Sequence, residues 1–396
     1  MTRWTAVALA TLASTLAALT AFAAPAGAAP ADRFTPVAAE VLAAPEPVLA
    51  SDGRRHLEYE LILTNHSYPP ATETVHRIQA LAGGKVIASL SGARLAAVMK
   101  PFDLAPGDAS KATRVLAPGV AGSILVDLSF PPGAELPRRI VHRITIAQQP
   151  PSGVIATRYL AAPTRVFARK ALVVEPPLRG PGWVIGNGCC AEATSHRSGI
   201  LAVDGGLYDG ERFAIDFFQI GPTGTVSFGP HDQLSSWPFF GAEVLSATAG
   251  TVVGVRDGLP DGPFSLELPP ITAADAGGNH VVVALGHRRY AFYAHLQPGS
   301  MQVKVGDRVR PGQLLGLLGN SGNSNAPHLH FQLMDGQLPL GSNGIPFTFS
   351  RFREEGTLRN FAQLLVLGAK AKISPRPSGV RHRQLPLNNE VVGFAP

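Results

Sequence analysis

Apolar and polar residues alternate with a period of two along much of the chain, and stripes with helical spacing are few. Between Leu57 and Leu63 the odd positions are apolar, and Glu58 and Glu60 stand between them. This alternation is typical of a half-buried strand. Turns rich in proline and glycine, such as Pro131-Pro132-Gly133, separate the segments. Further strands are predicted at residues 74–81, 85–90, 123–130, 140–146, 213–218, 250–255, 280–285, 290–295, 313–318 and 328–334. The pattern therefore predicts an all-β protein.

The spacing of these strands indicates two β domains. Short strands separated by turn signals across residues 46–168 predict an immunoglobulin-like β-sandwich. A linker rich in proline and glycine, residues 169–182, leads to a second β domain at residues 183–350. Residues 351–396 form a C-terminal extension, and its tail from about residue 370 is expected to be disordered or draped over the surface because it lacks periodicity.

The N-terminus has the pattern of an export signal. Arg3 precedes the apolar run at residues 6–22, and small residues at 26–28 suit a cleavage site. We expect a signal peptide at residues 1–28, with a retained membrane helix as the alternative, followed by a flexible lead at residues 29–45. No later segment is apolar for long enough to span a bilayer. The protein is therefore expected to be secreted.

Charge and composition narrow the class of partner. The formal net charge is +6, from 34 basic and 28 acidic residues, which suits an anionic surface such as the acidic polymers of a cell wall. The basic residues are scattered and form no helical stripe, so a nucleic-acid partner is not expected. Few residues are charged (16%), whereas 42 are glycine and 35 proline, which favours a β protein dense in turns.

The chain has two cysteines, the neighbours Cys189 and Cys190. Export permits a disulfide between them, although adjacent residues need an unusual geometry to form one. Two free thiols or a pair of soft metal ligands are the alternatives.

Histidines and one aspartate on strands of the second domain form a candidate metal site. His328 and His330 are two residues apart on a predicted strand, so both side chains lie on one face. Asp216 lies on the strand at residues 213–218, and His295 ends the strand at residues 290–295. Zinc binds nitrogen and oxygen ligands tetrahedrally and can keep one position for water, whose pKa it lowers toward neutral. A nearby imidazole can accept the proton of that water.

Several glycine-rich and histidine motifs occur in a set order across about residues 180–350. The motifs are Tyr293-Ala294-His295-Leu296, Gly306-Asp307-Arg308-Val309, Gly312-Gln313, Gly319-Asn320-Ser321-Gly322 and His328-Leu329-His330. In this order and composition the segment resembles the lysostaphin/LytM-type zinc metallopeptidases, which are peptidoglycan endopeptidases with a small antiparallel β fold.

The resemblance implies a role for each site residue. Asp216 and His330 would be zinc ligands. His295 and His328 would be the catalytic pair that orients water and stabilises the tetrahedral intermediate. The expected fold is then an immunoglobulin-like β-sandwich followed by an antiparallel β metallopeptidase domain of the lysostaphin/LytM type, with Zn²⁺ as cofactor and peptidoglycan as partner.

The chain departs from the family pattern at Arg212. The resemblance implies a histidine ligand four residues before Asp216, and on a strand residue 212 would point toward the metal. An arginine has no lone pair to donate and stays charged. Either another residue is the third ligand, or the site holds no metal.

His196 is the predicted substitute. We expect residues 196–203 to form a strand that pairs antiparallel with residues 211–218, which brings His196 near Asp216. His231 is the alternative ligand, and a site with two ligands or none is the remaining possibility.

Three classes of function follow from these patterns. The leading hypothesis is a secreted zinc endopeptidase that cuts peptide bonds in bacterial peptidoglycan. The second is a catalytically degenerate relative that binds or regulates the wall, and Arg212 motivates it. The third is an adhesion or carbohydrate-binding protein built on the sandwich, which leaves the histidines unexplained.

Overall fold

The strands of the chain are organised around two main hydrophobic cores, one in each half. The computed structural model describes residues 32–103, 112–148, 155–190, 193–265, 272–375 and 379–395, so the predicted signal peptide lies outside the described residues. Among these residues the α-helices are two short ones, α1 and α2, and the predicted all-β class is confirmed.

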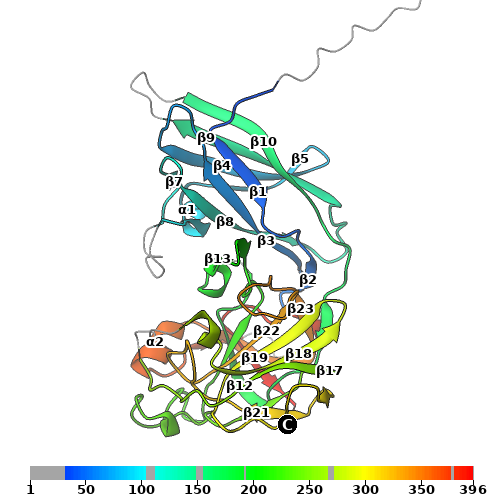
Figure 1. The fold of residues 1–396 in the computed structure, drawn as a ribbon, viewed down its shortest axis with the longest axis vertical. Helices are drawn as coiled ribbons and strands as arrows, with labels where there is room; N and C mark the ends of the chain where they lie inside the picture. Colours follow the sequence, from blue (N-terminus) through cyan, green and yellow to red (C-terminus); the bar gives the residue numbers. More distant parts are fainter. Residues whose placement is uncertain are drawn as a thin grey trace, which may run out of the picture. The chain divides into compact units, whose positions relative to one another are not determined.

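The N-terminal half consists of two five-stranded sheets (Figure 1). The first has the order β1-β3-β8-β6 with β2 paired to β3, and the second has the order β10-β9-β4-β5 with β7 paired to β4. All of these pairings are antiparallel, as a sandwich requires, and the immunoglobulin-like topology stays a prediction. The elements are β1 (Val37–Val41), β2 (Pro47–Leu49), β3 (Arg55–Asn65), β4 (Glu73–Ala82), β5 (Lys85–Ser91), α1 (Gly92–Val98), β6 (Met99–Pro101), β7 (Val115–Leu116), β8 (Ala121–Phe130), β9 (Arg139–Gln148) and β10 (Ile155–Arg165).

Strand β3 is buried on both faces. Leu57, Tyr59 and Leu61 are fully buried in the N-terminal core. Because successive side chains of a strand point to opposite faces, Glu58 and Glu60 point away from that core, yet each is only 1% exposed. The alternation that predicted a half-buried strand thus belongs to a strand whose polar face is covered as well.

The C-terminal half is built on one twelve-stranded sheet with the order β11-β23-β26-β12-β15-β22-β19-β18-β17-β20. Strands β24 and β25 also pair with β23, and β13-β14 and β16-β21 form two small ribbons. The elements are β11 (Leu172–Val174), β12 (Gly180–Gly186), η1 (His196–Ser198), β13 (Leu201–Val203), β14 (Gly206–Tyr208), β15 (Ile215–Gln219), η2 (Leu234–Ser236), β16 (Glu243–Leu245), β17 (Gly250–Arg256), η3 (Ala273–Asp275), β18 (Asn279–Gly286), β19 (Arg289–Leu296), β20 (Arg308–Val309), β21 (Leu314–Leu317), β22 (Leu329–Met334), β23 (Phe347–Leu358), α2 (Phe361–Leu367), β24 (Ile373–Ser374), β25 (Gly379–Gln384) and β26 (Glu390–Phe394), where η marks a one-turn 3₁₀ helix.

Aromatic packing fixes the middle of this sheet. Phe217 of β15 and Phe331 of β22 are fully buried, and both rings lie against Phe349 of β23, with centroids 6.2 and 6.3 Å away. These side chains occupy the core face, so the alternate residues of β15 and β22 are left on the opposite face. That opposite face carries the candidate metal site.

Two expectations about the chain ends are wrong. The lead at residues 29–45 was expected to be flexible, but β1 pairs with β3 from Val37 to Val41. The tail was expected to be disordered or draped over the surface, but β26 lies between β12 and β23 and pairs with both. Its residues Val391, Val392 and Phe394 belong to the C-terminal core. A five-residue strand is too short for its periodicity to stand out, and its partners lie far away in the sequence.

A chain that ends at Asn388 tests the place of β26. Burial of a valine or phenylalanine side chain is worth about 1.5–3 kcal/mol, so loss of the strand is expected to remove roughly 5 kcal/mol. That amount is comparable with the whole stability of a typical domain, about 5–15 kcal/mol. Thermal unfolding followed by circular dichroism should show a much lower melting temperature or no cooperative transition. An unchanged melting temperature would mean that the tail is dispensable, as its sequence suggested.

Candidate metal centre

Asp216 and His330 face each other because β15 and β22 pair in the register that puts them directly opposite. Cross-strand neighbours of an antiparallel pair have Cβ atoms about 4.5–5.5 Å apart, close enough for side chains to meet. Here Nδ1 of His330 lies 3.0 Å from Oδ1 of Asp216. Both side chains are buried, with 4% and 5% of their surface exposed.

His196 reaches the same carboxylate from η1. Its Nε2 lies 3.1 Å from Oδ2 of Asp216, and its ring stands edge-on to His330 with centroids 4.9 Å apart. One donor atom from each of His196, Asp216 and His330 lies within 4.8 Å of the other two. The structure thus brings together the three residues that were predicted from the sequence as metal ligands.

The second nitrogen of each ligand candidate is held by an oxygen. Nδ1 of His196 lies 3.2 Å from the carbonyl of Ala214, and Nε2 of His330 lies 2.8 Å from Oε1 of Gln332. When these nitrogens carry the proton and donate it, the opposite nitrogen presents a lone pair toward Asp216. Such an outer hydrogen bond commonly orients a histidine that ligates a metal. Gln332 was not among the predicted site residues, although it lies on the same face of β22 as His330 and alternation could have identified it.

His328 and His295 lie together beside this cluster. Nε2 of His328 is 3.3 Å from Oδ1 of Asp216, while its Nδ1 lies 2.8 Å from the carbonyl of Ala326. The ring of His295 is 4.6 Å from that of His328, and its Nδ1 lies 2.8 Å from the carbonyl of Ser321. A backbone oxygen therefore holds Nδ1 of each imidazole, and Nε2 of each ring points away from that oxygen.

Asn187 is a further neighbour that the sequence did not reveal. Its Nδ2 donates a hydrogen bond of 2.7 Å to Oδ2 of Asp216. Asn187 follows β12, which pairs with β15 so that Gly186 stands opposite Asp216. Without that pairing, nothing in the local sequence marks this asparagine.

The charges of the centre act strongly on one another. Burial alone would raise the pKa of Asp216, but His196 and His328 outweigh it and hold the pKa well below the usual value. Burial would lower the pKa of His196, but Asp216 and Glu211 raise it to about 9. A metal ion bound to His196 would therefore have to displace a proton.

His295 behaves in the opposite way. Burial, together with the nearby His328 and His330, lowers the pKa of His295 well below that of an ordinary histidine. His295 is then neutral at pH 7, so one of its nitrogens can accept a proton. Pairs of titratable groups whose pKa values are pushed apart are common in active sites.

Arg212 does not point toward the centre, so the expectation that it shares a strand face with Asp216 is wrong. Residues 211–213 form a turn, and β15 begins only at Ile215. The guanidinium lies against Glu60 of β3, with Nε 2.7 Å from Oε1 and Nη2 in contact with Oε2. A permanent cation is thereby kept away from the site and neutralised.

The expected hairpin between residues 196–203 and 211–218 is also wrong. His196 lies in η1, and β13 pairs with β14 rather than with β15. The chain turns back sooner than expected because Asp204 and Gly205 close a tight turn with positive φ (48° and 81°). His196 still reaches Asp216, by way of η1 instead of a strand.

The other nominated residues lie elsewhere. Nε2 of His231 lies 3.0 Å from Oγ of Ser227, and its ring packs on Trp237 and Phe264, outside the donor cluster. Cys189 and Cys190 are joined by a disulfide, the first of the predicted alternatives.

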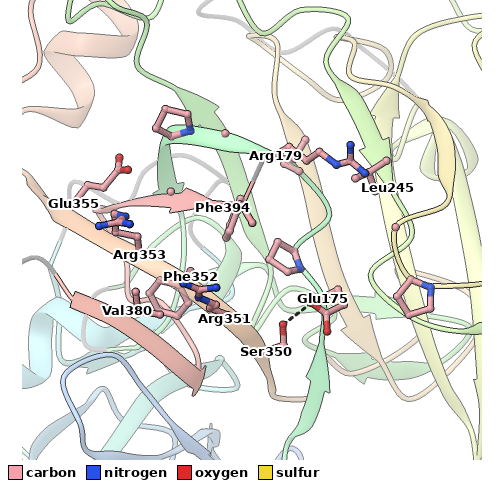
Figure 2. A pocket seen from close by; sticks show the side chains of 18 residues that line it. Glu175, Arg179, Leu245, Ser350, Arg351, Phe352, Arg353, Glu355, Val380 and Phe394 are labelled. Carbon is pink, nitrogen blue, oxygen red and sulfur yellow. Dashed lines mark hydrogen bonds between the residues drawn. The ribbon is translucent and has the colours of Figure 1, made fainter.

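A cavity of about 720 Å³ opens at a different place, between β23 and the segment before β12 (Figure 2). Arg179, Arg351 and Arg353 contribute to its lining, with Glu175 and Glu355 beside them. None of the five predicted site residues lines it.

The sequence of one segment matches a known family. Residues 238–341 match the model described as peptidase family M23. The matched segment contains His295, His328 and His330, whereas His196 and Asp216 precede it.

Three relatives with similar sequences are two endopeptidases by name and lysostaphin. The chain is 41% identical over 76 residues to the glycyl-glycine endopeptidase ALE-1 of Staphylococcus capitis, covering 18% of this chain and 20% of that protein. It is 46% identical over 61 residues to lysostaphin of Staphylococcus simulans (15% and 12%). It is 42% identical over 57 residues to the peptidoglycan DD-endopeptidase ShyA of Vibrio cholerae (14% and 13%). The matches thus span about a fifth or less of these relatives.

Solved structures give weaker matches. The catalytic domain of lysostaphin from Staphylococcus simulans is 23% identical, with 42% of this chain and 88% of that chain covered and a TM-score of 0.23. The M23 metalloprotease pseudoalterin is 18% identical, with 55% and 98% covered and a TM-score of 0.27. Scores this low carry no argument about the fold.

The family match covers the segment that holds His295, His328 and His330, three of the histidines from which the resemblance was predicted. Residues 238–341 therefore match peptidase family M23, and the predicted resemblance to the lysostaphin/LytM-type metallopeptidases is confirmed for this segment.

Proposed function

We propose that the protein is a secreted zinc endopeptidase that hydrolyses peptide bonds in bacterial peptidoglycan. The observation that carries the proposal is the convergence of His196, Asp216 and His330 within 4.8 Å, with two further imidazoles beside them. The names of the relatives with similar sequences support the substrate class. The signal pattern at residues 1–28 and the net charge of +6 support export to an anionic wall. Among the described residues, no helix has the length and apolar character needed to cross a bilayer.

The donor set suits zinc better than other common divalent ions. Two imidazole nitrogens and one carboxylate oxygen are the ligand types of catalytic zinc sites, which keep a further position for water or substrate. Calcium and magnesium prefer sites made of oxygen atoms. The outer hydrogen bonds that the rings donate to oxygens of Ala214 and Gln332 fix the two rings in the orientation that ligation needs.

The chain's own residues have distinct tasks in this proposal. Bound zinc would supply a Lewis acid that polarises the scissile carbonyl and activates water. His295 and His328 would take the proton of the attacking water, stabilise the oxyanion and return the proton to the leaving amine. Asp216, His196 and His330 would hold the metal, and the burial of all five side chains keeps bulk water away.

A catalytically degenerate wall-binding protein remains the second candidate. Arg212, which stands where the resemblance implies a histidine ligand, favours it. The position of His196 weighs against it, because with His196 the site again has three possible metal ligands. Zinc content separates the two candidates.

His330→Ala and His328→Ala are expected to have different effects on zinc content and wall hydrolysis. Loss of His330 removes a ligand, so zinc content measured by plasma mass spectrometry should fall along with wall hydrolysis. Loss of His328 should leave the metal bound but lower hydrolysis about 10²–10⁴-fold, the usual contribution of general acid–base catalysis. His287→Ala, at an exposed turn, is the matched control and should change neither. Full hydrolysis by His328→Ala would remove it from the catalytic pair.

His196→Ala tests the substituted ligand. Removal of one of three protein ligands should abolish stoichiometric zinc and hydrolysis together, while His231→Ala should keep both. Full zinc occupancy in His196→Ala would show that another residue completes the site.

We also propose that the cavity of Figure 2 binds acidic groups of wall polymers. Arg351 and Arg353 lie on the exposed face of β23, and Arg179 lines the same cavity. Within the described ranges, none of the three arginines forms an ion pair, whereas Glu175 accepts from Ser350 and Glu355 from the amide of Gly182. The cavity therefore offers unpaired guanidiniums, which suit phosphate and carboxylate.

The double variant Arg351→Ser/Arg353→Ser should bind isolated walls less tightly, and the loss should shrink as salt is raised. Arg77→Ser/Arg94→Ser, in exposed positions of the N-terminal half, makes the same change in net charge and serves as the control. Cosedimentation with purified walls measures both. Equal loss in the two variants would point to net charge rather than to this cavity.

A further inference from the structure

The polar face of β3 is covered by two arginines from the C-terminal half. Glu58 forms an ion pair with Arg197, and Glu60 forms one with Arg212. All four side chains are at most 4% exposed. These are buried charges, and removing one partner of such a pair leaves the other uncompensated in a medium of low polarity.

Arg197 is the immediate neighbour of His196 in η1. Successive residues of a 3₁₀ helix point about 120° apart, so one short turn can direct the two side chains to different targets. His196 points to Asp216. Arg197 points to Glu58, and its Nη1 donates a hydrogen bond to the carbonyl of Cys190. The contact with Asp216 in the C-terminal half and the contact with Glu58 in the N-terminal half therefore both fix the position of η1.

The second arginine acts on the other support of His196. The carbonyl that holds Nδ1 of His196 belongs to Ala214, two residues after Arg212. Arg212 is fixed by Glu60 and lies 3.9 Å from Asp209. The turn that leads into β15 is thus anchored to the same strand of the N-terminal half as η1 is.

The acidic side of this cluster outnumbers the basic side. Burial raises the pKa of Asp209, and the nearby Glu60 raises it further. Burial also raises the pKa of Glu58, against the pull of Arg197. The two guanidiniums are thus enclosed by three carboxyl groups, Glu58, Glu60 and Asp209.

We propose that Glu58, through Arg197, is a positioning residue for the metal centre, and that the N-terminal half holds the third ligand in place. The inference rests on the proposed zinc function. The resemblance implies a metal ligand at position 212, but in this chain Arg212 is there and pairs with Glu60. The third ligand, His196, comes instead from a single helical turn. A one-turn helix between loops has little stability of its own, because the first hydrogen-bonded turn is costly to form. The contact between Glu58 and Arg197 holds this turn in place. Glu58 itself is not one of the three proposed ligands, His196, Asp216 and His330.

Zinc affinity of the full-length Glu58→Ala variant tests the proposal. Competition with a chromogenic chelator should show zinc bound about 10–100-fold more weakly than in the wild type, as is typical when an outer partner of a ligand is lost. Glu354→Ala is the matched control, because Glu354 is equally buried and pairs with Arg381 of β25. That control is expected to lower stability and to leave zinc affinity unchanged. Glu58→Gln, which keeps the side-chain shape, carries the test if Glu58→Ala does not fold.

A double-mutant cycle with Arg197→Ala adds a second measurement. If the two residues act as a pair, the double variant should bind zinc no more weakly than the worse single variant. Wild-type zinc affinity in Glu58→Ala or Glu58→Gln, or equal losses in these variants and Glu354→Ala, would overturn the positioning role. A wild-type protein that binds no zinc would instead overturn the proposed function, so the two failures are distinguishable.

Discussion

The buried carboxylate of Asp216 is the group on which the rest of the centre depends. Two imidazoles and one amide lie within 3.1 Å of its oxygens, and a third imidazole lies 3.3 Å away. An ionised carboxylate is costly to bury unless it is paired, so its partners are a condition of the fold as much as of the chemistry. The register of β15 against β22 sets one partner, and η1 and the end of β12 bring the others.

The place of Arg212 shows how the chain keeps such a centre without a histidine at that position. A guanidinium beside a metal ion would repel it, and a buried guanidinium without a partner would destabilise the fold. Glu60 removes both difficulties by drawing Arg212 to the other side of the turn. The N-terminal half thereby supplies two carboxylates, Glu58 and Glu60, to two buried arginines of the C-terminal half, and the two halves share one buried network.

Much of the fold could be predicted because alternation is a local property. The strands that carry Asp216, His295 and His330 were predicted within about two residues of their observed bounds. The pairing of Asp216 with His330 followed from the resemblance, and the register confirms that they meet.

What could not be predicted depends on contacts between distant residues. The burial of Glu58 and Glu60 requires arginines about 140 to 150 residues away. Strand β26 is recognisable only beside its partners β12 and β23, and Asn187 approaches Asp216 only because β12 pairs with β15. His196 was identified correctly as a neighbour of Asp216 but by a wrong route, since its segment forms η1 and not a strand.

A crystal structure of the zinc-loaded protein with anomalous data at the zinc edge tests the central claim most directly. The account predicts a single strong peak about 2.0–2.2 Å from a nitrogen of His196, an oxygen of Asp216 and a nitrogen of His330. A peak that excludes His196, or no peak at this position in protein that contains stoichiometric zinc, would contradict it.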